Sequence, residues 1–548
     1  MPMAGRWAAG ELMFDVTVVG AGFGGLHMLY RLRELGFSVR GIEAAPDVGG
    51  AWYWNRYPGA RCDVESLVYS YTFSAEIDRE WNWTERYAAQ PEIKRYLSFV
   101  ADRLELRAMI QFSNHVEAAV FDQDENCWRI QTDKGLSFAS RFLVLATGPI
   151  SKPVLPDIPG IDEFGGTFVH TARWPEQEPD FAGKKVGIVG TGSSGVQTIP
   201  HVAKQAEKLT VFLRTANFTV PARNGPLSQD DLRKWGDEKN DIRTATWTGE
   251  IGGAGDVLMA KDLRQARLRP AREYTPEQRR DILERRWQWG GGVVMSSFAD
   301  VMTDPAVNDE VADFLREKIR ETVQDPKLAD LLTPRGFYVG TKRICVGTNY
   351  YETYNRDNVA VVDVKSHPIE RITPRGVVVN GVEHELDYII FATGFDALTG
   401  ALTSIEVRGK DGRTINEAWS RGPQTFLGLA VQGFPNMLMI GGPGSPSVLS
   451  NVVQTNEYQV ELIARFLTVL RERGNTHFDV DPDAQATWTA HVNEVVHRSL
   501  FGTSDSWYVG ANIPGKPRVI LAYTGGIRAY RMKCEELCEN DFRGFLID

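Results

Sequence analysis

Gly20-Ala-Gly22-Phe-Gly-Gly25 and Gly190-Thr-Gly192-Ser-Ser-Gly195 are the two stretches that decide the fold of this chain. Each cluster follows a short apolar run, at residues 14–19 and 184–189. In a dinucleotide-binding βαβ unit the first glycine makes a tight turn, the second admits the pyrophosphate, and the third lets helix pack on strand. Amides at the start of the helix then bind the phosphates. A single cluster is equally compatible with a plain tight turn, but two in this context predict two nucleotide-binding units.

The two units differ at the end of their second strand. Glu43 closes the first unit, where its carboxylate can accept hydrogen bonds from a ribose diol and would repel a 2′-phosphate. Arg214 and Thr215 close the second unit, and the guanidinium fork of arginine matches a phosphate. We therefore interpret the first unit as an FAD site and the second as an NADPH site. A chain with both sites can pass hydride from one cofactor to the other.

Length and composition narrow the class of protein. A chain of 548 residues is too long for one core, and its net charge of −10 argues against nucleic acid or an acidic membrane surface as partner. No apolar stretch approaches the length that spans a bilayer. The five cysteines are scattered and contain no CxxC pair, which suits free thiols in a reducing cytoplasm. The missing pair also argues against a flavin disulfide reductase, which needs a redox-active cysteine pair beside the flavin. The nine histidines lack metal-ligand spacing. We expect a cytoplasmic monomer or small homo-oligomer with small-molecule partners and no metal.

A repeated motif predicts the domain organisation. Apolar runs ending in Ala-Thr-Gly occur at residues 142–148 and 388–394, one after each glycine unit. The predicted fold is α/β, with two Rossmann-like dinucleotide-binding domains and a helical insertion. The predicted bounds are 1–150 and 385–548 for the FAD-binding domain, 151–223 and 334–384 for the NADP-binding domain, and 224–333 for the insertion. The two crossings between the domains would form a hinge.

The insertion carries clear helix signals. Thr275-Pro276-Glu-Gln278 is a capping box with proline at the first helical position, and residues 290–292 are glycines that end the helix. Asp304-Pro305 starts another helix with apolar residues at helical spacing. We expect a solvated helical cap packed on the NADP-binding domain. The alternative is that its loops border the mouth of a substrate pocket.

Three further motifs carry a family resemblance. They are residues 49–63 (GGAWYWNRYPGARCD), residues 164–175 (FGGTFVHTARWP) and residues 340–343 (GTKR). Together they resemble the type I Baeyer–Villiger monooxygenases, whose FxGxxxHxxxWP fingerprint is matched by Phe164, Gly166, His170, Trp174 and Pro175. The resemblance runs from Val18 to about Phe545 and is strongest to the phenylacetone and steroid monooxygenase branch, as in Ser506-Trp507-Tyr508.

The resemblance implies an NADPH- and dioxygen-dependent conversion of ketones to esters or lactones through a flavin peroxide. Arg343 would be the fixed cation that stabilises the developing negative charge, with Asp63 orienting its guanidinium. Taken alone, Arg343 is equally compatible with a surface phosphate binder or a salt bridge. Two other functions stay open: a heteroatom (N/S)-oxidising flavin monooxygenase, which would not need this cation, and a non-catalytic flavoprotein that senses redox state.

The resemblance and the glycine units also give the cofactor residues. The predicted FAD contacts are Gly20, Gly22, Gly24, Gly25, Glu43, Gly50, Ala51, Trp52, Tyr53, Trp54, Asp63, Tyr69, Val116 and Val452. The predicted NADP contacts are Arg61, Cys62, Gly190, Thr191, Gly192, Ser193, Ser194, Gly195, Gln197, Arg214, Thr215, Lys342, Arg343 and Trp507. Among these, Lys342, Arg214 and Thr215 would form the clamp for the 2′-phosphate.

The remaining predictions concern the fingerprint histidine and the substrate. His170 fits a hydrogen-bonded position at the domain junction, with a role in positioning or hinge movement, better than it fits a general acid or base. Ser447, Val448 and Leu449 are predicted to line the ketone pocket. Two departures from the phenylacetone branch, Val452 and Pro149, would change the shape and polarity of that pocket, so aryl-ketone preference does not carry over.

Overall fold

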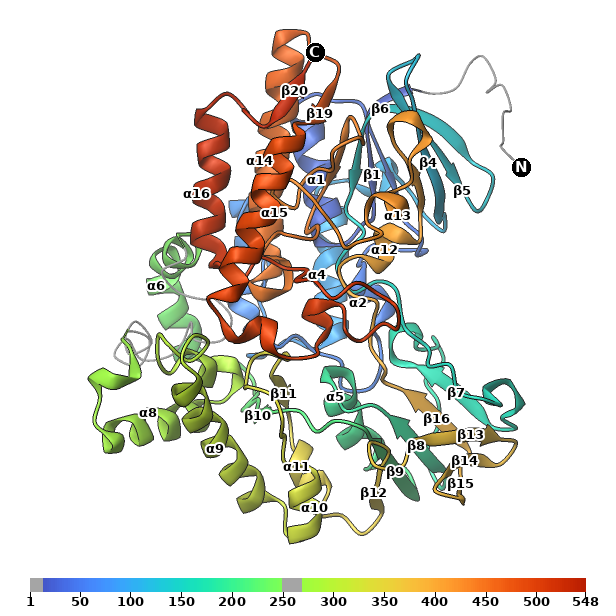
Figure 1. Cartoon of the computed structure of the whole chain (residues 1–548), viewed down its shortest axis with the longest axis vertical. Coiled ribbons are helices and arrows are strands. Elements are labelled where there is room, and N and C mark those ends of the chain that lie inside the picture. The colour runs from blue at the N-terminus through green and yellow to red at the C-terminus, as the bar shows by residue number, and fades with distance from the viewer. Residues whose placement is uncertain (1–12, 249–268) are drawn as a thin grey trace.

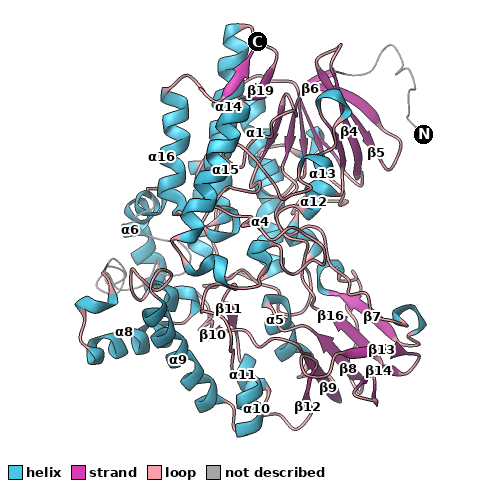
Figure 2. Ribbon diagram, in the orientation of Figure 1, coloured by secondary structure: helices cyan, strands magenta, loops and turns pink. Residues whose placement is uncertain are grey.

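Two separate sheets organise the chain. The computed structural model describes residues 13–248 and 269–548 (Figure 1). Figure 2 shows one group of strands in the upper part of the molecule and another in the lower part, with helices around both. Each sheet contains one glycine-rich unit, which confirms the predicted α/β fold with two Rossmann-like units. Within the described residues, no helix is both long enough and apolar enough to cross a membrane.

The upper sheet holds the first unit. Its strand order is β17-β4-β5-β6-β1-β2-β3, and β18 also pairs with β6. The bounds are β1 Met13–Val19, β2 Val39–Ile42, β3 Ile110–Gln111, β4 Val116–Asp122, β5 Cys127–Thr132, β6 Ser137–Leu145, β17 Glu406–Arg408 and β18 Met437–Met439. Strand β1 pairs in parallel with β2 and β6, and its Val16 and Val18 are fully buried. A parallel strand covered on both faces is mostly apolar, and in the buried part of β1, residues 16–19, only Thr17 is polar.

Helices cover the upper sheet and connect its strands. Helix α1 (Phe23–Glu34) follows the first glycine cluster and packs on α14. The other helices of this half are α2 Ala51–Trp54, α3 Ala75–Glu80, α4 Gln90–Arg103, α12 Gly400–Thr403, α13 Ile415–Ala418, α14 Val452–Arg473, α15 Pro482–His497 and α16 Gly526–Glu539. Helix α14 begins where the Asn451 side chain accepts the Val453 N–H, and it ends at Gly474 with φ +73°.

The lower sheet holds the second unit and is parallel throughout. Its order is β12-β9-β8-β16-β7. The bounds are β7 Thr167–His170, β8 Lys185–Val189, β9 Lys208–Leu213, β12 Val359–Asp363 and β16 Tyr388–Phe391, with helices α5 Ser193–Val202 and α11 Tyr350–Thr353.

Three smaller sheets complete the strands. They are formed by β10 Thr219–Pro221 with β11 Cys345–Gly347, by β13 Ile369–Thr373 with β14 Gly376–Val379 and β15 Val382–Glu385, and by β19 Phe478–Val480 with β20 Phe545–Ile547.

The chain passes between the halves twice, near residues 149–154 and near residues 392–398, and these two crossings lie side by side. Val154 N–H donates to the Gly394 carbonyl over 3.0 Å, and Leu398 N–H donates to the Pro149 carbonyl over 2.7 Å. Strand β16 pairs with β8 and β7, so it belongs to the lower sheet and the chain returns to the upper half only after Ala392. The predicted boundary at residue 385 is therefore wrong. The second Ala-Thr-Gly motif, at residues 392–394, follows the last strand of the lower half. The sequence had suggested that the strand before this motif already belongs to the upper half.

The insertion contacts both halves. Its helices are α6 Gln229–Trp247, α8 Pro276–Trp289, α9 Pro305–Thr322 and α10 Pro326–Leu331, and the Thr275 capping box is present. Helix α6 packs on the upper half, where Lys239 and Arg243 pair with Asp78. On α9, Ile319 instead joins the core of the lower half. The prediction that the insertion packs on the NADP-binding domain is thus correct for α9 and wrong for α6.

Candidate active site

A cavity of about 1510 Å³ lies between the halves and is lined by both glycine clusters. Ligand pockets usually have volumes of about 300 to 1,000 Å³, so this space exceeds the needs of one small molecule. None of the described residues of the insertion lines the cavity. The alternative that insertion loops border the substrate mouth gains no support from that part of the chain; residues 249–268 lie outside the described residues.

The first glycine cluster has the geometry of a phosphate cradle. Gly20 has φ +108°, and a Cβ there would lie 2.4 Å from the Ala146 carbonyl oxygen. A Cβ on Gly25 would lie 1.9 Å from the Gly20 carbonyl oxygen, so α1 can pack this closely only with glycine. Gly22 caps α1 without a side-chain hydrogen bond, which leaves the amides of the first turn free for an anion. The residues therefore fit the pyrophosphate of a dinucleotide.

The second cluster repeats this geometry in the lower sheet. Gly190 has φ +109°, and its Cβ would lie 2.5 Å from the Ala392 carbonyl oxygen. On Gly195, a Cβ would lie 2.3 Å from the Gly190 carbonyl oxygen. Gly192 caps α5 without a side-chain hydrogen bond, and nothing lies within 4 Å of where its Cβ would be. A second dinucleotide therefore fits here as well.

Glu43 is a buried carboxylate at the edge of the cavity. It is 5% exposed, and its two oxygens accept the Ala21 and Ala45 N–H groups over 2.7 and 2.8 Å. Burial raises the pKa of this carboxyl, while those amides lower it in part. The side chain is thus fixed beside the first glycine cluster, in the position from which a ribose diol is recognised.

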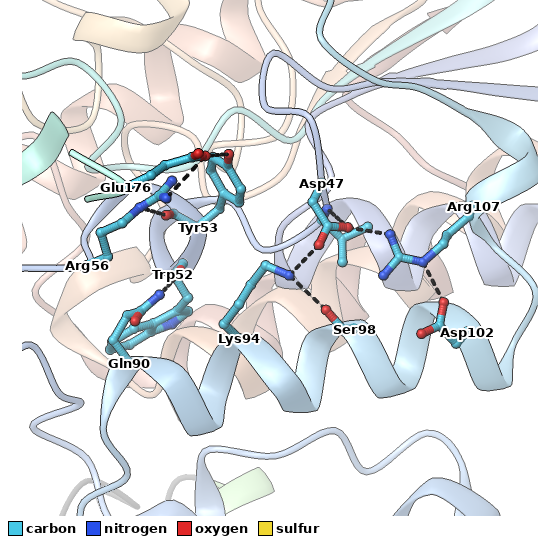
Figure 3. A network of polar contacts seen from close by, with 11 residues as sticks. Asp47, Trp52, Tyr53, Arg56, Gln90, Lys94, Ser98, Asp102, Arg107 and Glu176 are labelled. Atoms are coloured by element: carbon cyan, nitrogen blue, oxygen red, sulfur yellow. Dashed lines mark hydrogen bonds and ion pairs between the residues drawn. The ribbon is translucent and has the colours of Figure 1, made fainter. Parts of the chain in front are cut away.

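An aromatic segment after β2 forms another wall of the cavity. Trp52 and Trp54 line it, and the Trp52 indole N–H donates to the Tyr69 hydroxyl over 3.1 Å. Figure 3 shows how α4 supports this segment: Gln90 donates to the Trp52 carbonyl, and Lys94 pairs with Asp47 over 2.6 Å. These contacts hold α2 in place next to the first glycine cluster.

Arg343 and Asp63 form a bidentate ion pair within the cavity lining. Nε and Nη2 of Arg343 donate to the two Asp63 oxygens over 2.7 and 2.8 Å. Nη1 donates to the Val448 carbonyl over 2.9 Å. Burial alone would raise the pKa of Asp63, but Arg343 outweighs it and holds that pKa below its ordinary value. Asp63 in turn holds the pKa of Arg343 above its ordinary value, so the pair is charged.

The number of N–H groups on Arg343 limits how many hydrogen bonds it can donate to a ligand in the cavity. A guanidinium has five N–H groups, and three of them donate to described residues. The Tyr508 hydroxyl is a further hydrogen-bond partner of the guanidinium, and Arg343 lowers its pKa against the effect of burial. The side chain is 33% exposed and lines the cavity. It can therefore still donate a hydrogen bond to a negatively charged oxygen inside the cavity.

Lys342 and Arg214 bring two positive charges together at the cavity. Burial lowers the pKa of Lys342, Arg214 lowers it further, and Asp505 acts in the opposite direction. Lys342 Nζ donates to the Asp505 carbonyl. Arg214 is exposed and forms no ion pair with another described residue. Two like charges side by side are stabilised by an anion between them, so the pair fits a phosphate.

The loop at residues 57–63 joins the halves. The Tyr57 hydroxyl donates to Gln197 Oε1 over 2.8 Å, and Gln197 Nε2 donates to the Arg61 carbonyl over 3.0 Å. Burial raises the pKa of Tyr57 to about 12. Arg61 and Cys62 also line the cavity. Gln197 therefore ties α5 to the loop that carries Asp63.

His170 bridges the two crossings. Its Nδ1 accepts the Ala172 N–H over 3.0 Å, so the hydrogen of the neutral ring is on Nε2, which faces the Val154 carbonyl at 3.3 Å and Thr393 Oγ1 at 3.2 Å. Burial lowers its pKa and keeps the ring neutral. The fingerprint residues Phe164, Gly166, His170, Trp174 and Pro175 do not line the cavity. This arrangement favours a positioning role over acid–base catalysis.

Most of the predicted cofactor residues line the cavity, and the exceptions have physical reasons. Gly25 and Gly195 lie where helix packs on strand. Tyr53 points away: its hydroxyl donates to Glu176 over 3.3 Å (Figure 3). The structure therefore does not support Tyr53 as a FAD contact. The cavity lining includes the remaining predicted positions, among them Ala51, Val116, Val452, Thr191, Ser193, Ser194, Thr215 and Trp507.

The predicted substrate loop is only partly at the cavity. Val448 lines it, whereas Ser447 is fully buried with φ +41° and Leu449 packs against Leu398 and Leu521. Ser447 and Leu449 are therefore not placed on the cavity wall. Residues 447–449 form one 3₁₀ turn, in which successive side chains point about 120° apart, and of these three residues only Val448 lines the cavity.

Several cavity residues escaped the sequence analysis. They belong to both crossings, to the loop after β9 and to the C-terminal segment: residues 150–158, Phe395, Asn217, Asp505, Asn512 and Pro514. The crossings could have been found from the Ala-Thr-Gly repeat, because these residues follow strand ends next to the glycine clusters. The C-terminal residues carry no local signal.

Two dinucleotide sites that share a cavity with a partly exposed arginine fit the class of flavoprotein monooxygenases. A family model described as "Pyridine nucleotide-disulphide oxidoreductase" matches residues 17–233. Acetone monooxygenase (methyl acetate-forming) of Gordonia sp. (strain TY-5) is 42% identical over 536 residues, 97% of this chain and 99% of that protein. A Baeyer–Villiger monooxygenase of Pseudooceanicola batsensis is 40% identical over 98% of this chain and 96% of its own length. Phenazine N-monooxygenase PhzNO1 of Lysobacter antibioticus is 40% identical over 97% of both chains.

A solved structure gives the same result. "Oxidized steroid monooxygenase bound to NADP" superposes with a TM-score of 0.91 at 45% identity, and the match covers 98% of this chain and 99% of that one. The chain belongs to the Baeyer–Villiger monooxygenases. It is an FAD-dependent monooxygenase that uses NADPH, and the reaction of the family is the conversion of ketones to esters or lactones.

Proposed function

We propose that Arg343 is the catalytic cation of this chain and that a ketone reacts beside it. The observation that carries the proposal is the bidentate Arg343–Asp63 pair, whose guanidinium is partly exposed at the cavity. Bound FAD, once reduced by NADPH, activates dioxygen. Insertion of an oxygen next to a carbonyl places negative charge on oxygen, and a preorganised cation stabilises that charge where water is scarce. Arginine can do this without losing its own proton.

The other residues have supporting roles in this proposal. Asp63 orients the guanidinium, and the Val448 carbonyl holds it from another side by accepting a hydrogen bond from Nη1. Arg214 and Lys342 hold the 2′-phosphate of NADPH, and Glu43 holds the ribose of FAD. Pro149 and Val452 line the cavity and contribute to its shape. The proposed partners are a small-molecule ketone and dioxygen, and the proposal includes a cytoplasmic monomer or small homo-oligomer.

Replacement of Arg343 tests the proposal. In Arg343→Ala we expect ester formation to fall at least 100-fold, because removal of one charge-stabilising donor costs roughly 10² to 10³ in rate. Reduction of the flavin by NADPH should persist. The measurement is ester yield per NADPH consumed, with a panel of linear, cyclic and aryl ketones. Unchanged ester formation would remove Arg343 from the reaction.

A matched variant guards against a structural artefact. Removing one partner of a largely enclosed pair leaves an uncompensated charge, so Arg343→Ala can also destabilise the fold. Arg343→Ala combined with Asp63→Asn removes most of that penalty. If the double variant binds FAD yet forms no ester, the loss is chemical. Recovery of ester formation in the double variant would make the pair structural.

Heteroatom oxidation is the second candidate, because one relative at 40% identity is named a phenazine N-monooxygenase. Amines and sulfides are soft nucleophiles and need no anionic oxygen to attack them. Arg343→Ala should therefore lose ketone oxidation while any sulfide oxidation persists. A wild-type enzyme that oxidises amines or sulfides but no ketone in the panel would favour this second function.

A further inference from the structure

The segment at residues 504–505 lies against the Gly340-Thr-Lys342-Arg343 motif. Thr341 is fully buried, and Ser504 is 8% exposed. Their hydroxyl oxygens are 2.7 Å apart, and Thr341 Oγ1 is also 2.7 Å from the Tyr338 carbonyl oxygen. One residue further along both segments, Lys342 Nζ donates to the Asp505 carbonyl. The two segments thus meet through two consecutive contacts.

The direction of the hydroxyl contact follows from the number of hydrogens. A threonine hydroxyl has one hydrogen, and a carbonyl oxygen can only accept. Thr341 therefore donates to the Tyr338 carbonyl, and Ser504 must donate to Thr341. Tyr338 lies in a turn whose next residue, Val339, is held through its N–H and carbonyl by the buried side chain of Asn308, at 2.9 Å each. The hydroxyl chain thus fixes Ser504 to a rigid part of the molecule.

This chain determines where the Lys342 ammonium lies. A lysine side chain has four rotatable bonds and points in one direction only if a partner holds it. The partner here is the main-chain carbonyl of Asp505, next to Ser504. The carboxylate of Asp505 pairs with Arg518, and its charge also raises the pKa of Lys342. A shift of residues 504–505 would therefore move the Lys342 ammonium relative to Arg214, with which it shares the edge of the cavity.

We propose that Ser504 and Thr341 are positioning residues for NADPH selectivity: their hydroxyl chain holds the Asp505 carbonyl where it directs Lys342 toward the 2′-phosphate. The inference rests on the phosphate clamp of the proposed function. It makes Ser504 a determinant of the preference for NADPH over NADH, although Ser504 does not touch the phosphate.

The test is a comparison of the two nicotinamide cofactors in the FAD-loaded enzyme. In Ser504→Ala, KM for NADPH should rise roughly fivefold, the effect of losing one hydrogen bond. KM for NADH, kcat at saturating NADPH, and flavin content should stay at wild-type values. Ser504→Thr keeps the hydroxyl and should restore KM for NADPH. An equal rise of KM for both cofactors, or no rise for either, would overturn the inference.

A double-mutant cycle separates this inference from the clamp. In a Lys342→Met background, Ser504→Ala should raise KM for NADPH no further, because the group that it positions is gone. Additive effects in the double variant would mean that Ser504 acts elsewhere. If Lys342→Met alone left KM for NADPH unchanged, the clamp itself would fail, and the positioning role with it. A rise with Lys342→Met but none with Ser504→Ala overturns only the positioning role.

Discussion

The two dinucleotide units are nearly the same in backbone and opposite in charge. In each unit the first glycine lies against the carbonyl of an Ala-Thr-Gly motif, at 2.4 Å for a Cβ on Gly20 and 2.5 Å on Gly190. The helix caps, Gly22 and Gly192, both lack side-chain hydrogen bonds. The second strand, however, ends in buried Glu43 in one unit and in exposed Arg214 in the other.

This difference shows how one backbone serves two cofactors. A carboxylate that recognises an uncharged diol gains strength from burial, because hydrogen bonds compete less with water there. In the proposed phosphate clamp, Arg214 can act near solvent, and Lys342 supplies a second positive charge beside it. The buried site suits a cofactor that stays bound, and the exposed site suits one that exchanges during each turnover.

The largest expected effect on cofactor binding comes from placing a methyl group where helix packs on strand, first in one unit and then in the other. A Cβ at Gly25 would lie 1.9 Å from a backbone oxygen, and one at Gly195 would lie 2.3 Å from the equivalent oxygen. Gly25→Ala should therefore abolish FAD binding, seen as loss of flavin absorbance in the purified protein. Gly195→Ala should keep the flavin and lose its reduction by NADPH.

Gly236→Ala is the matched control for these variants. It lies within α6, and nothing lies within 4 Å of its added Cβ. Alanine in a helix interior is favoured over glycine by about 1 kcal/mol, so cofactor binding should not change. Loss of both cofactors in Gly195→Ala would show that the two units do not act separately.

The next effect concerns the charge at the end of the second strand. Arg214→Ala should raise KM for NADPH roughly 10- to 100-fold, because a hydrogen bond to a charged group contributes about 1.5 to 3 kcal/mol. KM for NADH should change little, since NADH lacks the 2′-phosphate. Steady-state kinetics with both cofactors measures this difference, and equal effects on both would refute the phosphate clamp.

The smallest effect is a pH dependence of the same clamp. The folded-state pKa of Lys342 is lowered, so its charge is lost at a lower pH than for an ordinary lysine. Only the protonated ammonium attracts the phosphate, so KM for NADPH should rise with pH, and the rise should begin at a lower pH than an ordinary lysine would give. KM for NADH should not follow. In Lys342→Arg the rise should disappear, because arginine keeps its proton; a rise that persists would assign it to another group.

The cofactor units were predictable from the sequence because their information is local. A glycine with positive φ, a helix start without a side-chain cap and a charged strand end all lie within short segments of chain. The capping box at Thr275 and the cap of α9 at Asp304 were predictable for the same reason. Domain boundaries were less predictable: β16 repeats the Ala-Thr-Gly motif of β6, yet pairs with β8 in the other sheet.

The sequence by itself determined two nucleotide units, their opposite charges and the motifs that carry Asp63 and Arg343. Only the tertiary structure decided which distant residues complete the site, because side-chain direction and long-range pairing depend on packing. It turned Tyr53, Ser447 and Leu449 away from the cavity. It also brought residues 504–505 against Thr341 and Lys342 across a separation in sequence that no local pattern records. Local backbone chemistry selects the cofactors, while contacts between distant segments set the position of each charge.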